Sequence, residues 1–280
     1  MVVADPHFDL DDAESPVEKS DARVLRSLDF DSDHVKRFER LEGTSEEGQQ
    51  VGGRLGVVPW TRAHALEARL KSARSPSILH IASHAFFLPH RGKLRPLAAL
   101  SQEPSEGAGI PEGLARLQRL ENPMLRSGIA LAGANLTLAG KTIAVTDAED
   151  GVLTAADVAS ELELSSTTLV VLSACETGLG EVEMGEGVFG LSRSFGLAGA
   201  QTLVMSLWQV DDTTTQETMD LFYGNLAAGM TCSVALAQAK TEMKKRYPAP
   251  YFWGAFICHG NPDSILSGRH DAMQPAGVLS

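Results

Sequence analysis

The chain has 280 residues, of which 43% are hydrophobic and 21% are charged, as in soluble globular proteins that bury a large core. Its net charge of −12 argues against nucleic acid or an anionic membrane as a partner, because phosphate binding uses clustered Lys and Arg. No apolar run approaches the roughly 20 residues that span a bilayer, and the acidic start MVVADPHFDLDDAE is unlike a secretory signal. We therefore expect a cytoplasmic protein.

The cysteine content predicts reduced thiols. Cys175, Cys232 and Cys258 form an odd and widely spaced set, which fits neither a disulfide framework nor a zinc site. We expect no metal and no cofactor.

In chain order, short apolar runs alternate with segments of helical spacing. Strands are predicted at 1–4, 78–83, 142–145, 167–173, 202–208 and 255–260, and helices at roughly 45–54, 62–73, 154–161, 187–198, 213–227 and 231–246. The strands are almost continuously apolar, which is typical of strands covered on both faces. This alternation predicts an α/β fold with a mainly parallel sheet. Thr154 and Asp157 predict a capping box at the third of these helices.

We predict one domain over residues 1–263, without internal repeats, and a poorly ordered tail over 264–280. Residues 88–136, rich in Pro, Gly, Arg and Leu, form a long excursion between two strands, of a length that is usually functional or mobile. Its basic residues are candidate self-cleavage points, although a soluble basic loop explains them equally well: Arg91, Lys93, Arg95, Arg116, Arg119 and Arg126.

Two polar residues occupy equivalent places, because His84 follows the strand ILHIAS and Cys175 follows TTLVVLSA. The carboxyl ends of parallel strands meet at one edge of a sheet, and neighbouring strands lie only about 4.8 Å apart. A thiol and an imidazole placed in this way suit nucleophilic catalysis. The alternative is that Cys175 is a packing residue, since free cysteine is among the most buried residue types.

Two other patterns do not predict binding sites. His80 and His84 resemble an HxxxH metal pair, but on a strand they lie roughly 13 Å apart, so we interpret His80 as a partly buried strand residue. The segment GLGEVEMGEG (178–187) lacks the P-loop pattern and carries three glutamates that would repel phosphate. It is either a flexible acidic loop beside Cys175 or a solvated connection.

Several segments together are similar to the CHAT domain family, the caspase-like domains related to separase. They are VVADPHFDL (2–10), LEGTSEEG (41–48), ILHIASHAFF (78–87), DGVLTAADV (150–158), LVVLSACETGLG (169–180), GEGVFGLSRSFGLAGAQTLVMSLWQVDD (185–212), LFYGNLAAG (221–229) and YFWGAFICHG (251–260). The resemblance implies a mixed, mostly parallel sheet flanked by helices. It also implies a cysteine endopeptidase dyad, with the histidine matching His84 and the cysteine matching Cys175.

The chain departs from these relatives at two places. Caspases carry a QACRG-like motif with the histidine about 50 residues upstream, whereas here the motif is SACETG and His84 lies 91 residues before Cys175. Family members often have Gly after the histidine, where backbone N–H groups are expected to form an oxyanion hole, but this chain has Ala85. If that position needs a positive φ, alanine is strained there. We predict the N–H groups of Cys175 and, with weaker support, Ala85 as oxyanion donors.

The resemblance also bears on specificity, because caspases bind aspartate through arginine, whereas separase-like relatives cleave after arginine. Asp211 and Asp212 follow the strand TLVMSLW, so we predict cleavage after Arg or Lys with Asp211 preferred as the pocket acid. The alternative for Asp212 is that it caps the next helix. Asp147 and Asp150, after TIAV, are further candidates for the pocket.

The expected protein is a bacterial, cytoplasmic cysteine endopeptidase that makes limited cuts in a protein substrate under control of a regulatory protein partner or a loop rearrangement. The main alternative is a catalytically silent caspase-like interaction module. A nucleotide-binding α/β protein is disfavoured by the missing phosphate motif. We expect no binding to nucleic acid or membrane.

Overall fold

The computed structural model describes residues 1–10, 37–87, 123–139, 141, 143, 148–173, 175–176, 186–208 and 210–264. Its largest element is a six-stranded sheet in the order β10-β9-β7-β3-β1-β2. These strands are β1 (Val2–Pro6), β2 (Trp60–Arg62), β3 (Ile78–Ala82), β7 (Leu169–Leu172), β9 (Thr202–Ser206) and β10 (Phe256–Gly260). All neighbouring pairs are parallel except β9 and β10. The predicted mixed, mostly parallel α/β fold is confirmed.

A second, four-stranded sheet was not anticipated. Its order is β6 (Val152–Thr154), β5 (Ser127–Ala130), β4 (His84–Phe87) and β8 (Cys175–Glu176). β4 and β8 are parallel, and the other pairs are antiparallel. β5 lies within the predicted excursion at 88–136, so the described end of that segment belongs to a sheet rather than to a loop.

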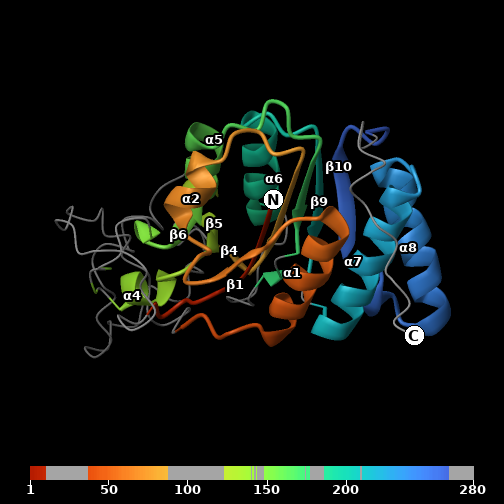
Figure 1. Cartoon of the computed structure of the whole chain (residues 1–280), viewed down its shortest axis with the longest axis horizontal. Coiled ribbons are helices and arrows are strands. Elements are labelled where there is room, and N and C mark those ends of the chain that lie inside the picture. Colours follow the sequence, from red (N-terminus) through yellow and green to blue (C-terminus); the bar gives the residue numbers. More distant parts are fainter. Residues whose placement is uncertain are drawn as a thin grey trace, which may run out of the picture.

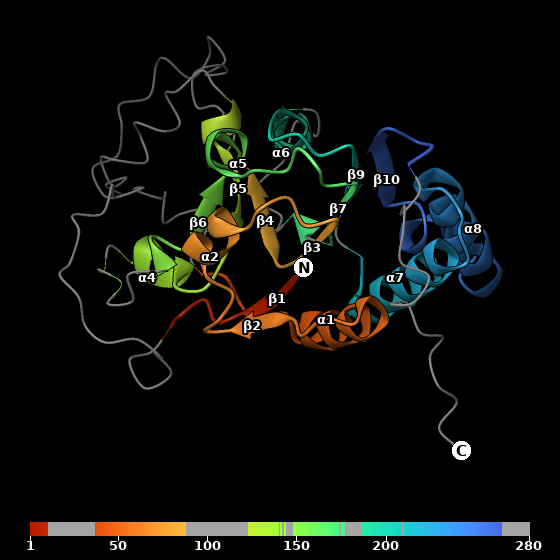
Figure 2. The ribbon, with the colours of Figure 1, turned by 45° about the horizontal axis from the view of Figure 1, so that its top comes forward.

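Helices cover both faces of the large sheet. They are α1 (Glu42–Leu55), α2 (Glu67–Ser72), α4 (Ala134–Leu138), α5 (Ala155–Glu161), α6 (Glu186–Leu197), α7 (Asp212–Ala227) and α8 (Cys232–Arg246), with 3-10 turns η3 (Pro123–Leu125) and η5 (Pro250–Phe252). Figures 1 and 2 show α1, α7 and α8 on one face and α5 and α6 on the other.

The strand residues explain this three-layer arrangement. In β7, Val170 and Leu172 pack in the cluster that includes α5 and α6, whereas Leu169 and Val171 pack in the cluster that includes α1, α7 and α8. Successive side chains of a strand point to opposite faces, so a continuous apolar run supplies both cores. Because both faces of these strands are buried, their apolar runs could be recognised in the sequence.

The predicted helices agree with the structure with one exception. The helix expected at 62–73 is wrong in its first part, because β2 and a turn precede the short α2. The strand expected at 142–145 lies outside the described residues apart from Ile143, as does the tail after Ser264. Of the acidic segment 178–187, only the backbone of its last two residues is described, at the start of α6. In the described part of the chain, no helix is both long and apolar enough to cross a membrane.

Candidate active site

His84 and Cys175 lie where two neighbouring strands pass from the large sheet into the small one. β3 continues into β4 beyond Ser83, and β7 continues into β8 after a short break. Two residue pairs have the same separation of 91 residues in the sequence: Ile81↔Leu172 in the large sheet and His84↔Cys175 in the small sheet. The register is therefore kept across the junction, and the Cα atoms of His84 and Cys175 are direct partners.

His84 is held by a backbone carbonyl. Its ring is almost buried, and Nε2 lies 2.7 Å from the carbonyl oxygen of Glu39. A carbonyl oxygen accepts hydrogen bonds only, so this contact places the proton of the neutral imidazole on Nε2. Nδ1 then carries the lone pair, and it has no hydrogen-bond partner among the described residues. The imidazole is thus in the tautomer that can accept a proton at Nδ1.

Two phenylalanines fix the plane of this ring. The His84 ring centroid lies 5.3 Å from that of Phe8 and 5.5 Å from that of Phe38, and Phe38 also contacts Phe86. Apolar neighbours exclude water from the imidazole. The position of the ring therefore depends on packing against the two phenylalanines and on the hydrogen bond to Glu39.

The electrostatic surroundings keep His84 neutral near neutral pH. Burial lowers the pKa of the imidazole, while the Glu39 carbonyl and the charges of Glu39 and Asp212 act in the opposite direction. A neutral histidine is the form that a general base requires.

The orienting carbonyl of Glu39 could not be identified from the sequence. Every residue carries a carbonyl, so no residue type marks it. The segment 37–41 forms neither helix nor strand, and only the fold carries it to His84.

The other two cysteines are poor candidates for a nucleophile. Burial raises the pKa of the Cys258 thiol to about 11, and it also raises the pKa of Cys232. A thiol must ionise to attack, so both are largely inert near neutral pH. For Cys175 the structure describes only the backbone, in β8.

Ala85 lies inside β4, where it pairs with Ile129 of β5 and Glu176 of β8. Its φ is not among the positive values of the chain, so the strain considered for alanine at this position is absent. The assignment of Ala85 and of the Cys175 N–H as oxyanion donors stays a prediction.

The alternative considered for Asp212, that it caps the next helix, is wrong. Asp211, not Asp212, is the N-cap of α7, and its carboxylate accepts hydrogen bonds from N–H and Oγ1 of Thr214 at 3.1 and 2.6 Å. Asp212 instead reaches the start of α1, where its Oδ2 accepts from Gly43 N–H at 3.0 Å. A Cβ at position 43 would overlap the Asp212 side chain, so this approach requires glycine. Of these two acids, Asp212 is the one whose charge acts on His84, in addition to that of Glu39.

Of the two acids predicted from the segment before β6, one is described by the structure. Asp147 lies outside the described residues. Asp150 accepts from Val152 N–H at 2.9 Å, and burial raises its pKa to about 6 in a cluster with Glu67 and Lys71. Its carboxylate is therefore engaged in a structural network rather than free to bind a substrate.

His80 has a structural environment. It is completely buried in β3, with Nδ1 3.0 Å from Tyr223 Oη and Nε2 3.3 Å from Glu47 Oε1. The expectation that it lies on a strand is confirmed, although it is more deeply buried than expected. Within the described ranges, no three His, Cys, Asp or Glu side chains are grouped closely enough to hold a metal ion.

One self-cleavage candidate falls within the described residues. Arg126 is only 2% exposed, directly before β5, so a protease could not reach it in the folded chain. The other five candidates lie outside the described part of the chain.

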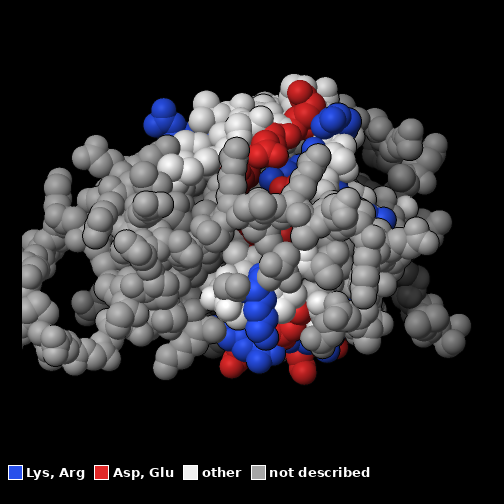
Figure 3. Space-filling model, turned by 90° about the vertical axis from the view of Figure 1, so that its left-hand side faces the viewer, with Lys and Arg blue, Asp and Glu red and all other residues white. Residues whose placement is uncertain are grey.

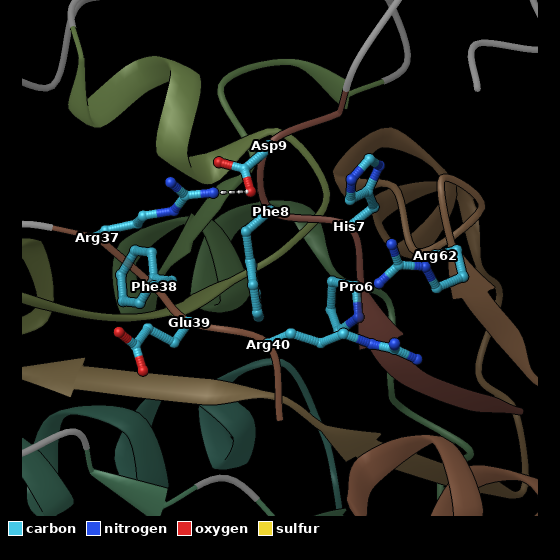
Figure 4. Close-up of a pocket in the computed structure, with 9 residues that line it drawn as sticks. All are labelled: Pro6, His7, Phe8, Asp9, Arg37, Phe38, Glu39, Arg40 and Arg62. Carbon is cyan, nitrogen blue, oxygen red and sulfur yellow. Dashed lines mark hydrogen bonds and ion pairs between the residues drawn. The ribbon is translucent and has the colours of Figure 1, made fainter. Parts of the chain in front are cut away.

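A cavity of about 360 Å³ lies beside the residues that contact His84, which are Phe8, Phe38 and Glu39 (Figure 4). It is lined by Pro6, His7, Phe8, Asp9, Arg37, Phe38, Glu39, Arg40 and Arg62. Phe8 and Phe38 contact both the cavity and His84. On the face drawn in Figure 3, acidic and basic side chains of the described residues lie next to one another.

Comparison with known proteins agrees with this architecture. Residues 1–261 match the family model of the CHAT domain. The chain is 28% identical over 242 residues to human Tetratricopeptide repeat protein 28, and 34% identical over 117 residues to its mouse counterpart. These matches cover 81% and 41% of this chain, but only 9% and 5% of the two relatives. Since the family model spans nearly the whole chain, the protein belongs to the CHAT domain family.

Proposed function

We propose that the chain is a cysteine endopeptidase in which His84 and Cys175 form the catalytic dyad. The observation that supports this most is the in-register pair His84↔Cys175, with the hydrogen bond to Glu39 leaving Nδ1 of His84 as the basic nitrogen. The CHAT domain adds a peptidase-related fold, although its presence alone does not establish catalysis.

In the proposed reaction, Nδ1 of His84 accepts the proton of the Cys175 thiol. The thiolate then attacks the scissile carbonyl carbon, and the C–N bond breaks as the imidazolium donates its proton to the leaving amine. Water attacks the resulting thioester with His84 again as the base, which releases the carboxylic acid product and restores the thiol. The Glu39 carbonyl stabilises the imidazolium formed in each half of the reaction.

For specificity we propose cleavage after Arg or Lys, with Asp212 in place of Asp211 as the preferred pocket acid. Both acids are exposed, and each accepts hydrogen bonds. Thr214 occupies both carboxylate oxygens of Asp211, whereas Gly43 N–H takes Oδ2 of Asp212, whose charge also acts on His84. A carboxylate forms charge-assisted hydrogen bonds with a guanidinium or an ammonium group.

We further propose that a protein partner regulates the enzyme. The two relatives are named for tetratricopeptide repeats, and the matched segment is less than a tenth of each. In those proteins the domain belongs to a much longer chain that could control it. Cytoplasmic location and bacterial origin remain predictions, and the two relatives are from human and mouse.

The test is incubation of the purified protein with a proteome-derived peptide library, with new termini read by mass spectrometry. We expect cuts after Arg or Lys that are absent for Cys175→Ala. Asp212→Asn should lower cleavage at these sites by about 100-fold or more, because a basic residue then lacks its counter-charge. Asp211→Asn, at the neighbouring acid, is the matched control.

If no peptide is cut and Cys175 is alkylated no faster than an ordinary thiol, the chain is the catalytically silent interaction module. If cleavage occurs without preference for Arg or Lys, the dyad stands and the acidic pocket is wrong.

A further inference from the structure

The Glu39 carbonyl, which binds His84, belongs to a segment without regular secondary structure. Residues 37–41 make no helix or strand, so no ladder of backbone hydrogen bonds fixes the peptide group of Glu39. Ordering each residue of such a segment costs roughly 1–2 kcal/mol. Interactions from neighbouring elements must therefore fix the carbonyl at 2.7 Å from Nε2.

The strongest of these contacts is an ion pair next to the carbonyl. Arg40 follows Glu39 directly, and its guanidinium binds both carboxylate oxygens of Asp5, with Nε–Oδ1 at 2.9 Å and Nη2–Oδ2 at 2.8 Å. The Asp5 side chain is 2% exposed. Such a two-point contact fixes direction as well as distance, and burial of the carboxylate reduces its screening by water.

Asp5, which contacts Arg40, has an unusual backbone conformation. It lies near the end of β1 with φ 44, and Arg62, on the neighbouring strand β2, has φ 52. Positive φ is rare for residues other than glycine and persists only where the surrounding structure enforces it. Arg62 Nη1 also reaches Asp5 Oδ1, at 3.5 Å, so the edge of the large sheet and the segment 37–41 share one carboxylate.

A second contact fixes the residue on the other side of Glu39. The side-chain amide of Asn135 accepts from Phe38 N–H at 2.8 Å and donates to Phe38 O at 3.0 Å. With Arg40 fixed by Asp5 and Phe38 fixed by Asn135, the peptide between them has little freedom to move away from His84. Figure 4 shows the segment beside residues 6–9.

We propose that Asp5 is a positioning residue for catalysis, which acts through Arg40 and the Glu39 carbonyl to hold the imidazole of His84. This inference rests on the proposed function, because it assigns Asp5 a role in the same dyad. Asp5 does not touch the reacting atoms. Its effect is on the orientation of the base and on the stability of the imidazolium.

Loss of the Asp5 carboxylate should raise the pH at which the Cys175 thiol ionises. A loosened Glu39 carbonyl stabilises the protonated His84 less well, so the imidazole becomes a weaker acceptor for the thiol proton. The thiol of Cys175 then ionises at higher pH, closer to the ordinary cysteine value of about 8.5. A change that only destabilises the fold would not move this titration.

The experiment measures iodoacetamide alkylation of Cys175 from pH 5 to 9 by peptide mass spectrometry, with Cys258 in the same molecule as an unactivated reference. The variants are Asp5→Asn, Arg40→Lys and the matched control Asp220→Asn. Asp220 forms a comparable partly buried pair with Arg54, between α1 and α7. His84→Asn shows whether the thiol depends on histidine at all. Melting temperatures of all variants are measured in parallel.

We expect Asp5→Asn to slow alkylation about 10-fold at pH 6.5 and to move its midpoint to higher pH, since small displacements of a catalytic group carry large rate penalties. Arg40→Lys, on a half-exposed side chain, should show a smaller shift in the same direction without unfolding. Asp220→Asn should leave the midpoint unchanged.

If Asp5→Asn and Arg40→Lys keep the unmodified midpoint while His84→Asn shifts it, the positioning role is wrong and the dyad stands. If His84→Asn has no effect either, the proposed function itself fails. A shift shared by Asp220→Asn would also overturn the inference, because the titration would then not depend specifically on the Asp5–Arg40 pair.

Discussion

Two histidines four residues apart lie in contrasting surroundings. His80, in the large sheet, has a polar atom of Tyr223 or Glu47 near each ring nitrogen and no exposed surface. His84, at the start of the small sheet, has one nitrogen bonded to a carbonyl and the other without a partner among the described residues. A buried polar atom without a partner costs roughly 1–3 kcal/mol. Nε2 of His80 also lacks a hydrogen bond, but Glu47 lies against it, whereas Nδ1 of His84 is left as the base that the proposed reaction needs.

The largest expected effect follows from changing the nitrogen without a partner. His84→Asn replaces the imidazole by a shorter amide, which provides no group that can accept a proton at neutral pH. We expect peptide cleavage to fall by about 100-fold or more, with little change in melting temperature. Cleavage at the unmodified rate would place the base elsewhere.

The corresponding change at the other histidine should affect stability and not chemistry. Tyr223→Phe removes the hydroxyl that lies 3.0 Å from Nδ1 of His80, in a completely buried position. We expect the free energy of unfolding to fall by roughly 1–3 kcal/mol, as measured by urea denaturation. The pH profile of Cys175 alkylation should stay the same, and a shifted profile would show that the two regions are coupled.

A buried acid, Glu67 of α2, lies in a cluster with Lys71 and Asp150 and should make stability depend on pH. Burial and then the charge of Asp150 raise the pKa of Glu67 from 4.5 to about 9, against the opposing effect of Lys71. Between these values the folded chain binds a proton that the unfolded chain has lost, so this group lowers stability as pH rises. Glu67→Gln does not titrate and should therefore become progressively more stable than the unmodified chain from pH 5 to pH 8. A difference in unfolding free energy that is constant with pH would contradict the raised pKa.

The smallest expected effect concerns the edge of the small sheet. Thr154 ends β6 and caps α5 through Asp157 in the predicted capping box. Thr154→Ala should lower the free energy of unfolding by about 1 kcal/mol and leave alkylation of Cys175 unchanged. A loss of thiol reactivity would show that the dyad depends on the whole small sheet rather than on its β4–β8 pair.

The sequence was most informative for the large sheet and its helices. Apolar runs such as LVVL are long enough to fill both cores, and start signals such as Thr154 with Asp157 are local, so both can be read without knowing the fold. The strands of the small sheet are short, and β4 and β8 follow β3 and β7 directly. No turn signal separates β3 from β4, which is why the second sheet was missed.

For the candidate site, the sequence identified the two residues at the strand ends and their family resemblance, because His84 and Cys175 each follow an apolar run in the same way. It also restricted the pocket acid to a few carboxylates, and the choice among them stays a prediction, but the cap of α7 considered for Asp212 belongs to Asp211. Whether Asp211 or Asp212 caps α7 depends on where the helix begins and on the glycine of α1 that faces Asp212.

The sequence by itself determined the α/β class, the main strands and helices, and the two candidate catalytic residues, since each depends on local periodicity or residue type. Only the tertiary structure decided the continuous register that pairs His84 with Cys175 and the carbonyl that selects the tautomer. It also decided the buried Asp5–Arg40 pair beside that carbonyl. These features join residues that are distant in the chain through backbone groups common to all residues, so no local pattern encodes them.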